Sequence, residues 1–144
     1  MTKTKTETPE LDPTDPDAYT HWVDDVIRFS DQDPGGHVNN AAYASYVEHG
    51  RVTLMRACHF DRLPGSRFVL AHLEIDYRAE GHFPARLRIG SRVRRIGTSS
   101  VTLGHAVFAD DRCLATATSV LVHMQGASAA PLPDAAREAL QARR

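Results

Sequence analysis

A single helical segment followed by four consecutive strand-like segments leaves few folds open to this chain of 144 residues. The helical segment runs from about Asn40 to His59. Between residues 69 and 124, apolar and polar side chains alternate with a period of two, interrupted by turn residues. Consecutive strands joined by short turns pair antiparallel. We therefore predict an α+β protein in which an antiparallel sheet covers a single long helix.

The helix and the last strand indicate how these elements pack. The apolar helical residues recur at 3.6-residue spacing: Tyr43, Tyr46, Val47, Gly50, Leu54, Ala57 and Cys58. Because Gly50 lowers helix propensity by about 1 kcal/mol relative to alanine, we predict that it allows close packing on the sheet. The segment 113–122 is apolar on both faces, which predicts a central strand. A short C-terminal helix is predicted from Ala135 to about Arg143.

An acidic, glycine-rich turn immediately precedes the long helix. A short strand is predicted over Trp22–Phe29, and Pro34-Gly35-Gly36 cannot continue it. Asn39 and Asn40 are favourable N-caps for the helix that follows. Backbone N–H groups at a helix start, together with the positive end of the helix dipole, can polarise a substrate oxygen. With carboxylates a few residues away, this arrangement is typical of an active site.

The same residues carry a family resemblance. The positions that carry it are Asp31, Asp33, Gly36, His37, Val38, Asn39, Asn40, Tyr43, Glu48 and Arg51. Their spacing resembles the signature of hotdog-fold acyl-CoA thioesterases, in particular the branch of 4-hydroxybenzoyl-CoA thioesterase. The resemblance implies a hotdog fold, with the sheet curled around the helix, and hydrolysis of an acyl-CoA thioester to the free acid and CoA. It also implies a homodimer or homotetramer, with sheets joined edge to edge and the site between subunits.

The resemblance assigns roles to residues of the turn. In this family the second aspartate, here Asp33, lies beside the thioester carbonyl as a nucleophile or as a general base toward water. The backbone N–H groups from Gly36 to Asn40 are candidate oxyanion donors, and the resemblance assigns the amide of Asn40 to the carbonyl. His37 could orient water or substrate, or could cap the helix. The alternative for Asp33 is turn chemistry alone, because Asp is common in such turns.

Two further observations bear on mechanism and specificity. Glu48 and Arg51 are three residues apart on the helix, as in an ion pair, although another hotdog branch uses a helix carboxylate as its catalytic base. The aromatic-substrate prototype has bulky apolar residues where this chain has His37, Asn39 and Asn40. These polar residues favour the broader acyl-CoA thioesterases over a 4-hydroxybenzoyl substrate.

A cluster of arginines precedes a serine-containing turn. Its members are Arg86, Arg88, Arg92, Arg94 and Arg95. Arginine and serine side chains can hold the 3′-phosphate and diphosphate of CoA. Because the resembled family places phosphate contacts in this region, Arg94, Arg95, Ser99 and Ser100 are the predicted CoA-binding residues. The alternative is a solvated strand face that resists edge aggregation.

Composition excludes several classes of partner. A net charge of −1 gives no general electrostatic attraction to nucleic acid or membrane. No apolar run approaches the roughly 20 residues that span a bilayer, and Lys3 and Lys5 are not followed by the apolar region of a secretory signal. Cys58 and Cys113 lie in apolar patterns without metal-ligand spacing, as expected for reduced, buried thiols of a cytoplasmic protein. We expect no metal site and no cofactor other than the CoA of the substrate.

The predicted organisation is a polar tail followed by one domain. Residues 1–20 contain three prolines and little that could be buried, so a disordered or loosely docked tail is expected. Residues 21–144 form the single hotdog thioesterase domain. Two alternatives to hydrolysis remain at this point. One is a non-catalytic acyl-CoA-binding protein of the same fold, and the other is a hotdog hydratase or dehydratase, for which Glu48 and His37 would have to serve as the catalytic pair.

Overall fold

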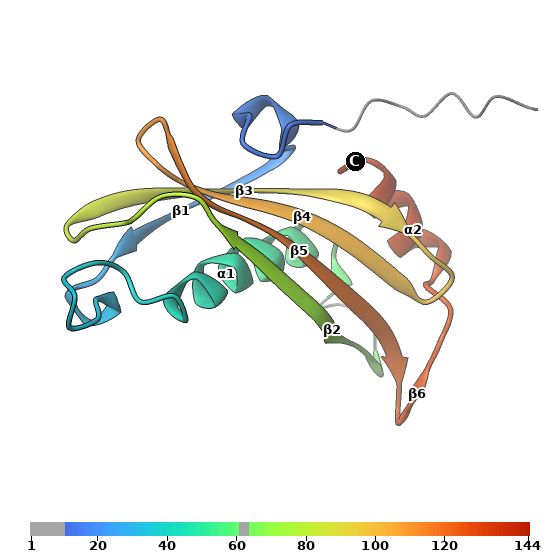
Figure 1. Ribbon diagram of the computed structural model, residues 1–144. Helices are drawn as coiled ribbons and strands as arrows, with labels where there is room; N and C mark the ends of the chain where they lie inside the picture. The colour runs from blue at the N-terminus through green and yellow to red at the C-terminus, as the bar shows by residue number, and fades with distance from the viewer. Residues whose placement is uncertain (1–10, 61–63) are drawn as a thin grey trace, which may run out of the picture.

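The computed structural model describes residues 11–60 and 64–144, which form one curled antiparallel sheet with a long helix in its concavity (Figure 1). The strands are β1 (His21–Ile27), β2 (Ser66–Tyr77), β3 (Ala85–Ile96), β4 (Ser100–Ala109), β5 (Arg112–Gln125) and β6 (Ser128–Ala129). The helices are α1 (Ala42–Ala57) and α2 (Asp134–Gln141), with 3-10 turns η1 (Pro16–Ala18) and η2 (Phe29–Asp31). This arrangement confirms the predicted α+β hotdog fold.

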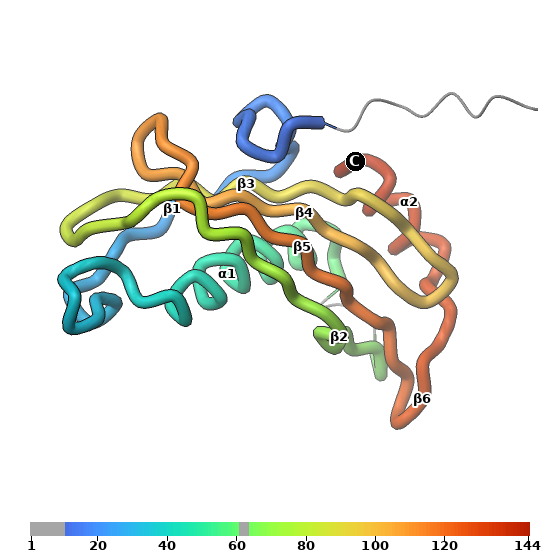
Figure 2. The backbone as a smooth tube through the Cα atoms, in the orientation of Figure 1, coloured from blue at the N-terminus to red at the C-terminus, as the bar shows by residue number. Residues whose placement is uncertain are grey.

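The strand order is β1-β3-β4-β5-β2, with β6 pairing β5, and every pairing is antiparallel. The backbone trace shows the strands bending over α1 (Figure 2). The helix packs mainly against β3, β1 and β4. β5 lies between β4 and β2, so the prediction of a central final strand is confirmed. β1 and β2 are the two edges of the sheet.

The α1 helix approaches the sheet most closely at Gly50. A Cβ atom at this position would lie 2.7 Å from Ile89 Cγ2 and 2.8 Å from Ser91 Oγ, so a side chain there would collide with β3. The predicted role of Gly50 in close packing is therefore confirmed. Apolar clusters fill the space on both sides of this contact, one toward each end of the helix. The α2 helix contributes Ala136 and Leu140 to the second cluster.

Several element boundaries differ from the sequence-based expectation. The long helix begins at Ala42 rather than Asn40, because Asn39 ends the preceding loop: its Oδ1 accepts the Ala41 N–H at 2.9 Å and its carbonyl accepts the Ala42 N–H at 2.9 Å. The first strand ends at Ile27, and Phe29 belongs to η2 with 75% of its surface exposed.

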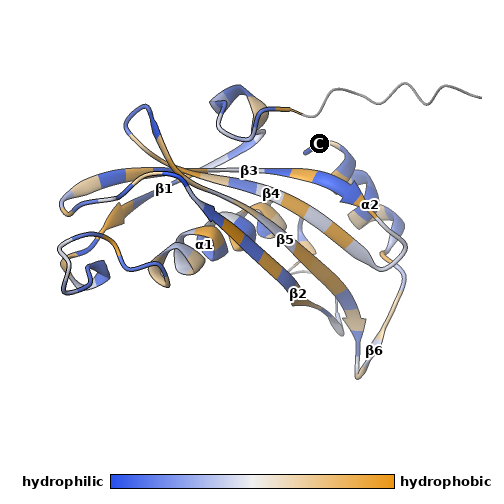
Figure 3. Cartoon of the chain, viewed as in Figure 1, coloured by the Kyte–Doolittle hydropathy of each residue, from blue (hydrophilic) through white to orange (hydrophobic). Residues whose placement is uncertain are grey.

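The alternation along β2 is interrupted by a bulge. The pairing of β2 with β5 shifts in register between Leu70 and His72. Phe68 packs on one apolar cluster and Leu73 and Ile75 pack on the other, although 68 and 73 differ in parity. A bulge inserts one residue into the strand and so moves the buried positions from even to odd numbers. The period-two alternation predicted from residue 69 therefore does not put all its apolar residues on one face of β2, although polar and apolar residues do alternate along the strand (Figure 3).

The N-terminal region predicted as a tail lies partly outside the described residues, which begin at residue 11. Its described part, residues 11–20, contains η1 and buries Ala18 and Tyr19. Tyr19 makes edge-to-face contacts with Trp22 and Phe108, and these residues form a small apolar cluster on the convex side of the sheet. In the described part of the chain, no helix combines the length and apolar character needed to cross a membrane.

Candidate active site

The turn between η2 and α1 is closed by its own backbone. The N–H of Asp33 donates to the carbonyl of His37 at 2.9 Å, and the N–H of Gly36 donates to the carbonyl of Asp33 at 3.1 Å. Gly36 has a φ of 82°, a left-handed conformation that glycine adopts without strain. The pair of glycines thus reverses the chain within four residues and brings His37 back beside Asp33.

The two oxygens of the Asp33 carboxylate have different neighbours. Oδ1 accepts the N–H of Gly35 at 2.8 Å, which is the bond expected for an aspartate that only stabilises a turn. Oδ2 lies 3.5 Å from Nδ1 of His37. The Asp33 and His37 side chains are 25% and 35% exposed, so both can be reached from solvent. One carboxylate oxygen of Asp33 therefore stabilises the turn. The other lies beside the His37 imidazole, where a base or nucleophile could act.

The backbone N–H of Asn40, just before α1, is an unused hydrogen-bond donor in the described part of the chain. Asn39 satisfies the N–H groups of Ala41 and Ala42, and the carbonyl of Asn40 accepts the Tyr77 hydroxyl at 2.9 Å. Within residues 11–60 and 64–144, the N–H of Asn40 has no hydrogen-bond acceptor. An unpaired N–H at a helix start is the type of donor that stabilises an oxyanion.

A cavity of about 300 Å³ opens beside this donor. It is lined by His37, Val38, Asn40, Tyr43, Tyr77, Arg78, Ala79 and Glu80. Asp33 contacts one of these residues, His37, through the 3.5 Å separation given above. The structure thus places His37 and Asn40 in the lining of one cavity and Asp33 beside His37, whereas Asp33 and Gly36 are not themselves part of that lining.

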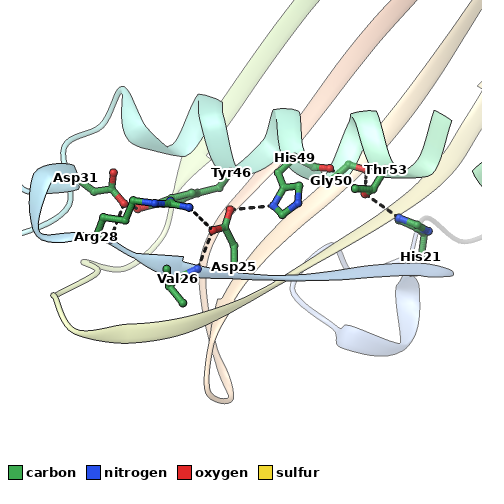
Figure 4. A network of polar contacts seen from close by, with 9 residues as sticks. All are labelled: His21, Asp25, Val26, Arg28, Asp31, Tyr46, His49, Gly50 and Thr53. Carbon is green, nitrogen blue, oxygen red and sulfur yellow. Dashed lines mark hydrogen bonds and ion pairs between the residues drawn. The ribbon is translucent and has the colours of Figure 1, made fainter. Parts of the chain in front are cut away.

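The other aspartate of the motif, Asp31, fastens the loop to the helix. Its Oδ2 accepts the N–H of Arg28 at 2.8 Å and the hydroxyl of Tyr46 at 2.7 Å, and its carbonyl accepts the N–H of Asn39 at 2.8 Å (Figure 4). Burial, and secondly the adjacent Asp31 carboxylate, raise the pKa of Tyr46 above its ordinary value, so the phenol remains a donor. Asp31 is a positioning residue.

A second part of this network joins β1 to α1. Nδ1 of His49 lies 3.0 Å from Oδ2 of Asp25, whose other oxygen lies 3.4 Å from Arg28, while His21 contacts Thr53 at 3.0 Å (Figure 4). These contacts were missed in the sequence because partners such as Asp25 and His49 are 24 residues apart and belong to different elements. The network holds the edge strand and the loop after it against the helix.

The Tyr46–Asp31 hydrogen bond offers a test of loop positioning. We expect Tyr46→Phe to lower the free energy of unfolding by roughly 1.5–3 kcal/mol, the range for a hydrogen bond to a charged group. Chemical denaturation of the two proteins measures this difference. Tyr43→Phe is the comparison, because Tyr43 is equally buried in the same helix and contacts the Tyr46 ring, but its hydroxyl bonds to the backbone of Gly81 rather than to a carboxylate. A loss no larger in Tyr46→Phe than in Tyr43→Phe would contradict the positioning role.

The residues predicted to bind CoA lie at the opposite end of the sheet. Ile27, which precedes the loop that contains Asp33, pairs with Ala85 at the start of β3, whereas the Ser99–Ser100 turn follows the other end of that strand. The 12 residues of β3 extend about 40 Å. A single chain therefore does not unite Arg94, Arg95, Ser99 and Ser100 with Asp33. Within the chain, Arg94 donates to Thr118 Oγ1 at 3.1 Å.

Glu48 and Arg51 occupy different environments despite their contact. Arg51 Nη2 lies 3.6 Å from Glu48 Oε2, and the arginine and glutamate side chains are 8% and 66% exposed. The predicted apolar stripe of the helix omitted Arg51 and Met55, both of which are buried. The arginine was missed because its charge indicates an exposed position. Of the two predicted buried thiols, Cys58 is buried and Cys113 is only partly so, and both are free.

A curled sheet around one helix, with an acidic turn and a free N–H at the helix start, defines a hotdog protein with the layout of an acyl-transfer site. The sequence model of the thioesterase-like superfamily matches residues 27–140 of this chain. No curated protein matches the sequence. The match to the family model covers most of the chain, which belongs to the thioesterase-like superfamily.

Solved structures agree with this assignment. A thioesterase from Thermus thermophilus, complexed with coenzyme A and Zn, is 34% identical, with 86% of this chain and 93% of that chain covered and a TM-score of 0.78. A thioesterase-superfamily protein from Jannaschia sp. CCS1 is 30% identical, with coverages of 85% and 81% and a TM-score of 0.78. The PA5185 protein from Pseudomonas aeruginosa PAO1 is 27% identical, with coverages of 90% and 94% and a TM-score of 0.82.

Proposed function

We propose that this protein is an acyl-CoA thioesterase that hydrolyses an acyl-CoA thioester to the free acid and CoA. The observation that carries the proposal is the unpaired N–H of Asn40 at the start of α1, in the same cavity wall as His37, the neighbour of the Asp33 carboxylate. Membership of the thioesterase-like superfamily supports the reaction class. The coenzyme A bound to the Thermus thermophilus thioesterase supports a CoA thioester as the substrate.

Two reaction routes use the same residues. In both, the thioester oxygen accepts the N–H of Asn40, which stabilises the negative charge that develops on it. Asp33 can take a proton from water while the water oxygen bonds to the carbonyl carbon, the C–S bond breaks and the CoA thiolate receives the proton. Alternatively, the Asp33 carboxylate itself bonds to the carbonyl carbon while the C–S bond breaks and CoA leaves as the thiolate. Water then hydrolyses the resulting anhydride to the free acid and the Asp33 carboxylate, and the proton released is taken up by the thiolate. In a single turnover in ¹⁸O-labelled water, label in Asp33 would establish the anhydride route, because direct attack by water places label only in the released acid.

An edge-to-edge homo-oligomer would complete the CoA site. The β2 strand is an edge with partly exposed apolar side chains, among them Leu70 and Tyr77, and such an edge favours pairing with a second chain. Antiparallel pairing through β2 reverses the second sheet and places the partner subunit's β3–β4 turn at the end where this chain has Asp33. We propose that phosphate binding by Arg94, Arg95, Ser99 and Ser100 operates across such an interface.

The side chains of the turn and the two cysteines support proposals about the substrate class and the cellular location. The polar side chains of His37, Asn39 and Asn40 favour an acyl-CoA thioesterase of broader specificity than the 4-hydroxybenzoyl-CoA branch that the motif resembles. Both cysteines are free, as in a cytoplasmic protein. No group of three or more His, Cys, Asp or Glu side chains in the described residues could hold a metal ion, so the zinc of the Thermus thermophilus structure has no counterpart in our proposal.

Release of free thiol tests the proposal. We expect the purified protein to release CoA from at least one member of a panel of short, medium, long and aromatic acyl-CoAs, measured with a thiol reagent. The same samples, supplied with an enoyl-CoA and followed by loss of its double-bond absorbance, test the hydratase alternative, which releases no CoA. Binding of acyl-CoAs without thiol release would favour the non-catalytic alternative and would contradict the proposed activity.

A further inference from the structure

Tyr77 connects the end of an edge strand to the start of the long helix. Its hydroxyl donates to the carbonyl oxygen of Asn40 at 2.9 Å, although the two residues are 37 positions apart in the sequence. Tyr77 is the last residue of β2 and pairs with Ala115 of β5, so the sheet fixes its backbone. Tyr77 and Asn40 both line the cavity of about 300 Å³ that also contains His37. Tyr77 therefore holds the residue whose N–H is the proposed oxyanion donor.

Asn40 lies outside the regular part of the helix, since α1 begins at Ala42 and Asn40 is exposed. The peptide unit before its Cα, which contains the Asn40 N–H, is held by the bond from the Ala42 N–H to the Asn39 carbonyl at 2.9 Å. The peptide unit after its Cα is held by Asn39 Oδ1, which accepts the Ala41 N–H at 2.9 Å, and by the Tyr77 hydroxyl. Of these three bonds, only the one from Tyr77 ties Asn40 to the sheet. Because the two units meet at one Cα, fixing both of them fixes the direction of the N–H.

Two tyrosines of α1 position the ring of Tyr77. The Tyr77 and Tyr43 rings are in edge-to-face contact with centroids 5.5 Å apart, and Tyr43 makes the same kind of contact with Tyr46 at 5.6 Å. Both helical tyrosines are 2% exposed. At the far end of this cluster Tyr46 donates to the Asp31 carboxylate, while the Asp31 carbonyl accepts the N–H of Asn39. The contacts therefore form a closed circuit from the loop through three tyrosines to the helix start and back to the loop.

We propose that Tyr77 is a positioning residue for thioester hydrolysis, because its hydroxyl holds the N–H of Asn40 where the oxyanion forms. This inference rests on the proposed thioesterase function. An oxyanion donor is effective only when it is aimed in advance at the developing charge, and a small displacement lowers the rate strongly. Tyr77 acts through Asn40 and transfers no proton itself. Its loss should therefore weaken the transition state more than the binding of substrate.

Tyr77→Phe tests the proposal by removing the hydroxyl while keeping the ring contact with Tyr43. We expect kcat for the best acyl-CoA to fall by roughly 10-fold, less than the ~10²–10³-fold loss of an entire oxyanion donor, because the N–H remains but is less well fixed. KM should stay unchanged, since the lost interaction acts on the transition state. Tyr19→Phe is the matched control: it also removes a tyrosine hydroxyl that donates to a backbone carbonyl, that of Pro13 on the convex side of the sheet. A kcat that is equal in Tyr77→Phe and Tyr19→Phe overturns the proposal.

Unreactive analogues separate this inference from the proposed reaction. Two analogues of the most tightly bound acyl-CoA are titrated: a ketone, in which a CH₂ group replaces the thioester sulfur, and the S-alkyl-CoA of equal chain length, which has no carbonyl oxygen. Wild type should bind the ketone more tightly than the S-alkyl-CoA. In Tyr77→Phe this preference should fall by roughly 3- to 10-fold, the range for one hydrogen bond, with no change in the affinity for the S-alkyl-CoA.

The analogue titration has outcomes that distinguish the two proposals. The expected loss of preference would support the role of Tyr77 even if wild type released no thiol. Thiol release with an unchanged preference would leave the hydrolase proposal intact and overturn the role of Tyr77. Equal losses for both analogues would place Tyr77 in ground-state binding, and a shift of the variant to smaller species on sedimentation would place it in assembly through β2. Either result would overturn the proposal.

Discussion

Asp33→Asn is expected to lower kcat/KM for the best acyl-CoA substrate by about 10²-fold or more, the loss typical of removing a positioned base or nucleophile. The amide oxygen of asparagine can still accept the N–H of Gly35, so the turn and the fold should remain intact. The loss is therefore chemical, because a neutral amide neither attacks a carbonyl nor removes a proton from water. Thiol release under saturating and limiting substrate, with melting curves for both proteins, measures the effect.

Asp31→Asn provides the matched control for this prediction. It makes the same chemical change two residues away, where the side chain accepts the Arg28 N–H and the Tyr46 hydroxyl rather than facing His37. An asparagine oxygen can accept both, so a much smaller loss of activity is expected. Equal turnover in Asp33→Asn and wild type would remove Asp33 from the mechanism and make Glu48 the next candidate base.

The sequence was sufficient for the elements whose evidence is local. The alternation of β3 and the 3.6-residue spacing from Tyr43 to Leu54 reflect the geometry of each segment by itself. For the same reason the turn around Asp33 could be anticipated, since Gly36 and Asn39 act on their immediate neighbours. Hydrophobic periodicity fails to predict which residues face the core where one residue is added to a strand, as at the β2 bulge beside Ala71. A bulge is visible only in the pairing with the neighbouring strand, which the sequence of β2 alone does not show.

Contacts between distant segments could not be predicted from the sequence. Nothing in the residues near Asp25 indicates that its partner is His49, because that pairing depends on how β1 lies beside α1. The burial of Arg51 depends in the same way on how α1 lies against the sheet. Sequence patterns report the faces of single elements, whereas these polar contacts arise only when two elements meet.

A buried histidine beneath α1 should make the protein sensitive to acid. His105 on β4 is 1% exposed, with Nδ1 2.8 Å from Ser91 Oγ and Nε2 2.8 Å from Ser119 Oγ. The close approach of Gly50 excludes water from this site. Burial, with a smaller contribution from the positive charge of Arg51, lowers the pKa of His105 from 6.5 to about 3. The imidazole therefore stays neutral in the folded protein at pH values where the unfolded chain would protonate it.

The sign of the pH dependence follows from proton uptake. Below pH 6.5 the unfolded state binds a proton at His105 that the folded state does not bind, so the free energy of unfolding falls as the pH falls. The loss attributable to His105 is about 1.4 kcal/mol per pH unit and continues until the pH approaches the folded pKa. His105→Gln lacks this titrating group. We expect its free energy of unfolding to be lower than that of wild type near pH 6.5. The difference between the two proteins should shrink by about 3 kcal/mol between about pH 6.5 and pH 4, because only wild type loses stability through His105.

Urea denaturation across this pH range measures the difference in free energy of unfolding between wild type and His105→Gln. The protonation of other groups is common to both proteins and cancels in that difference. His59→Asn is the control: His59 is exposed, and asparagine tolerates its φ of 62°. The decrease in the difference is expected in His105→Gln and not in this variant, which retains His105. A deficit for His105→Gln that stays constant across the same range would show that His105 takes up its proton in the folded state, which would require water or an anion to enter the space beneath Gly50.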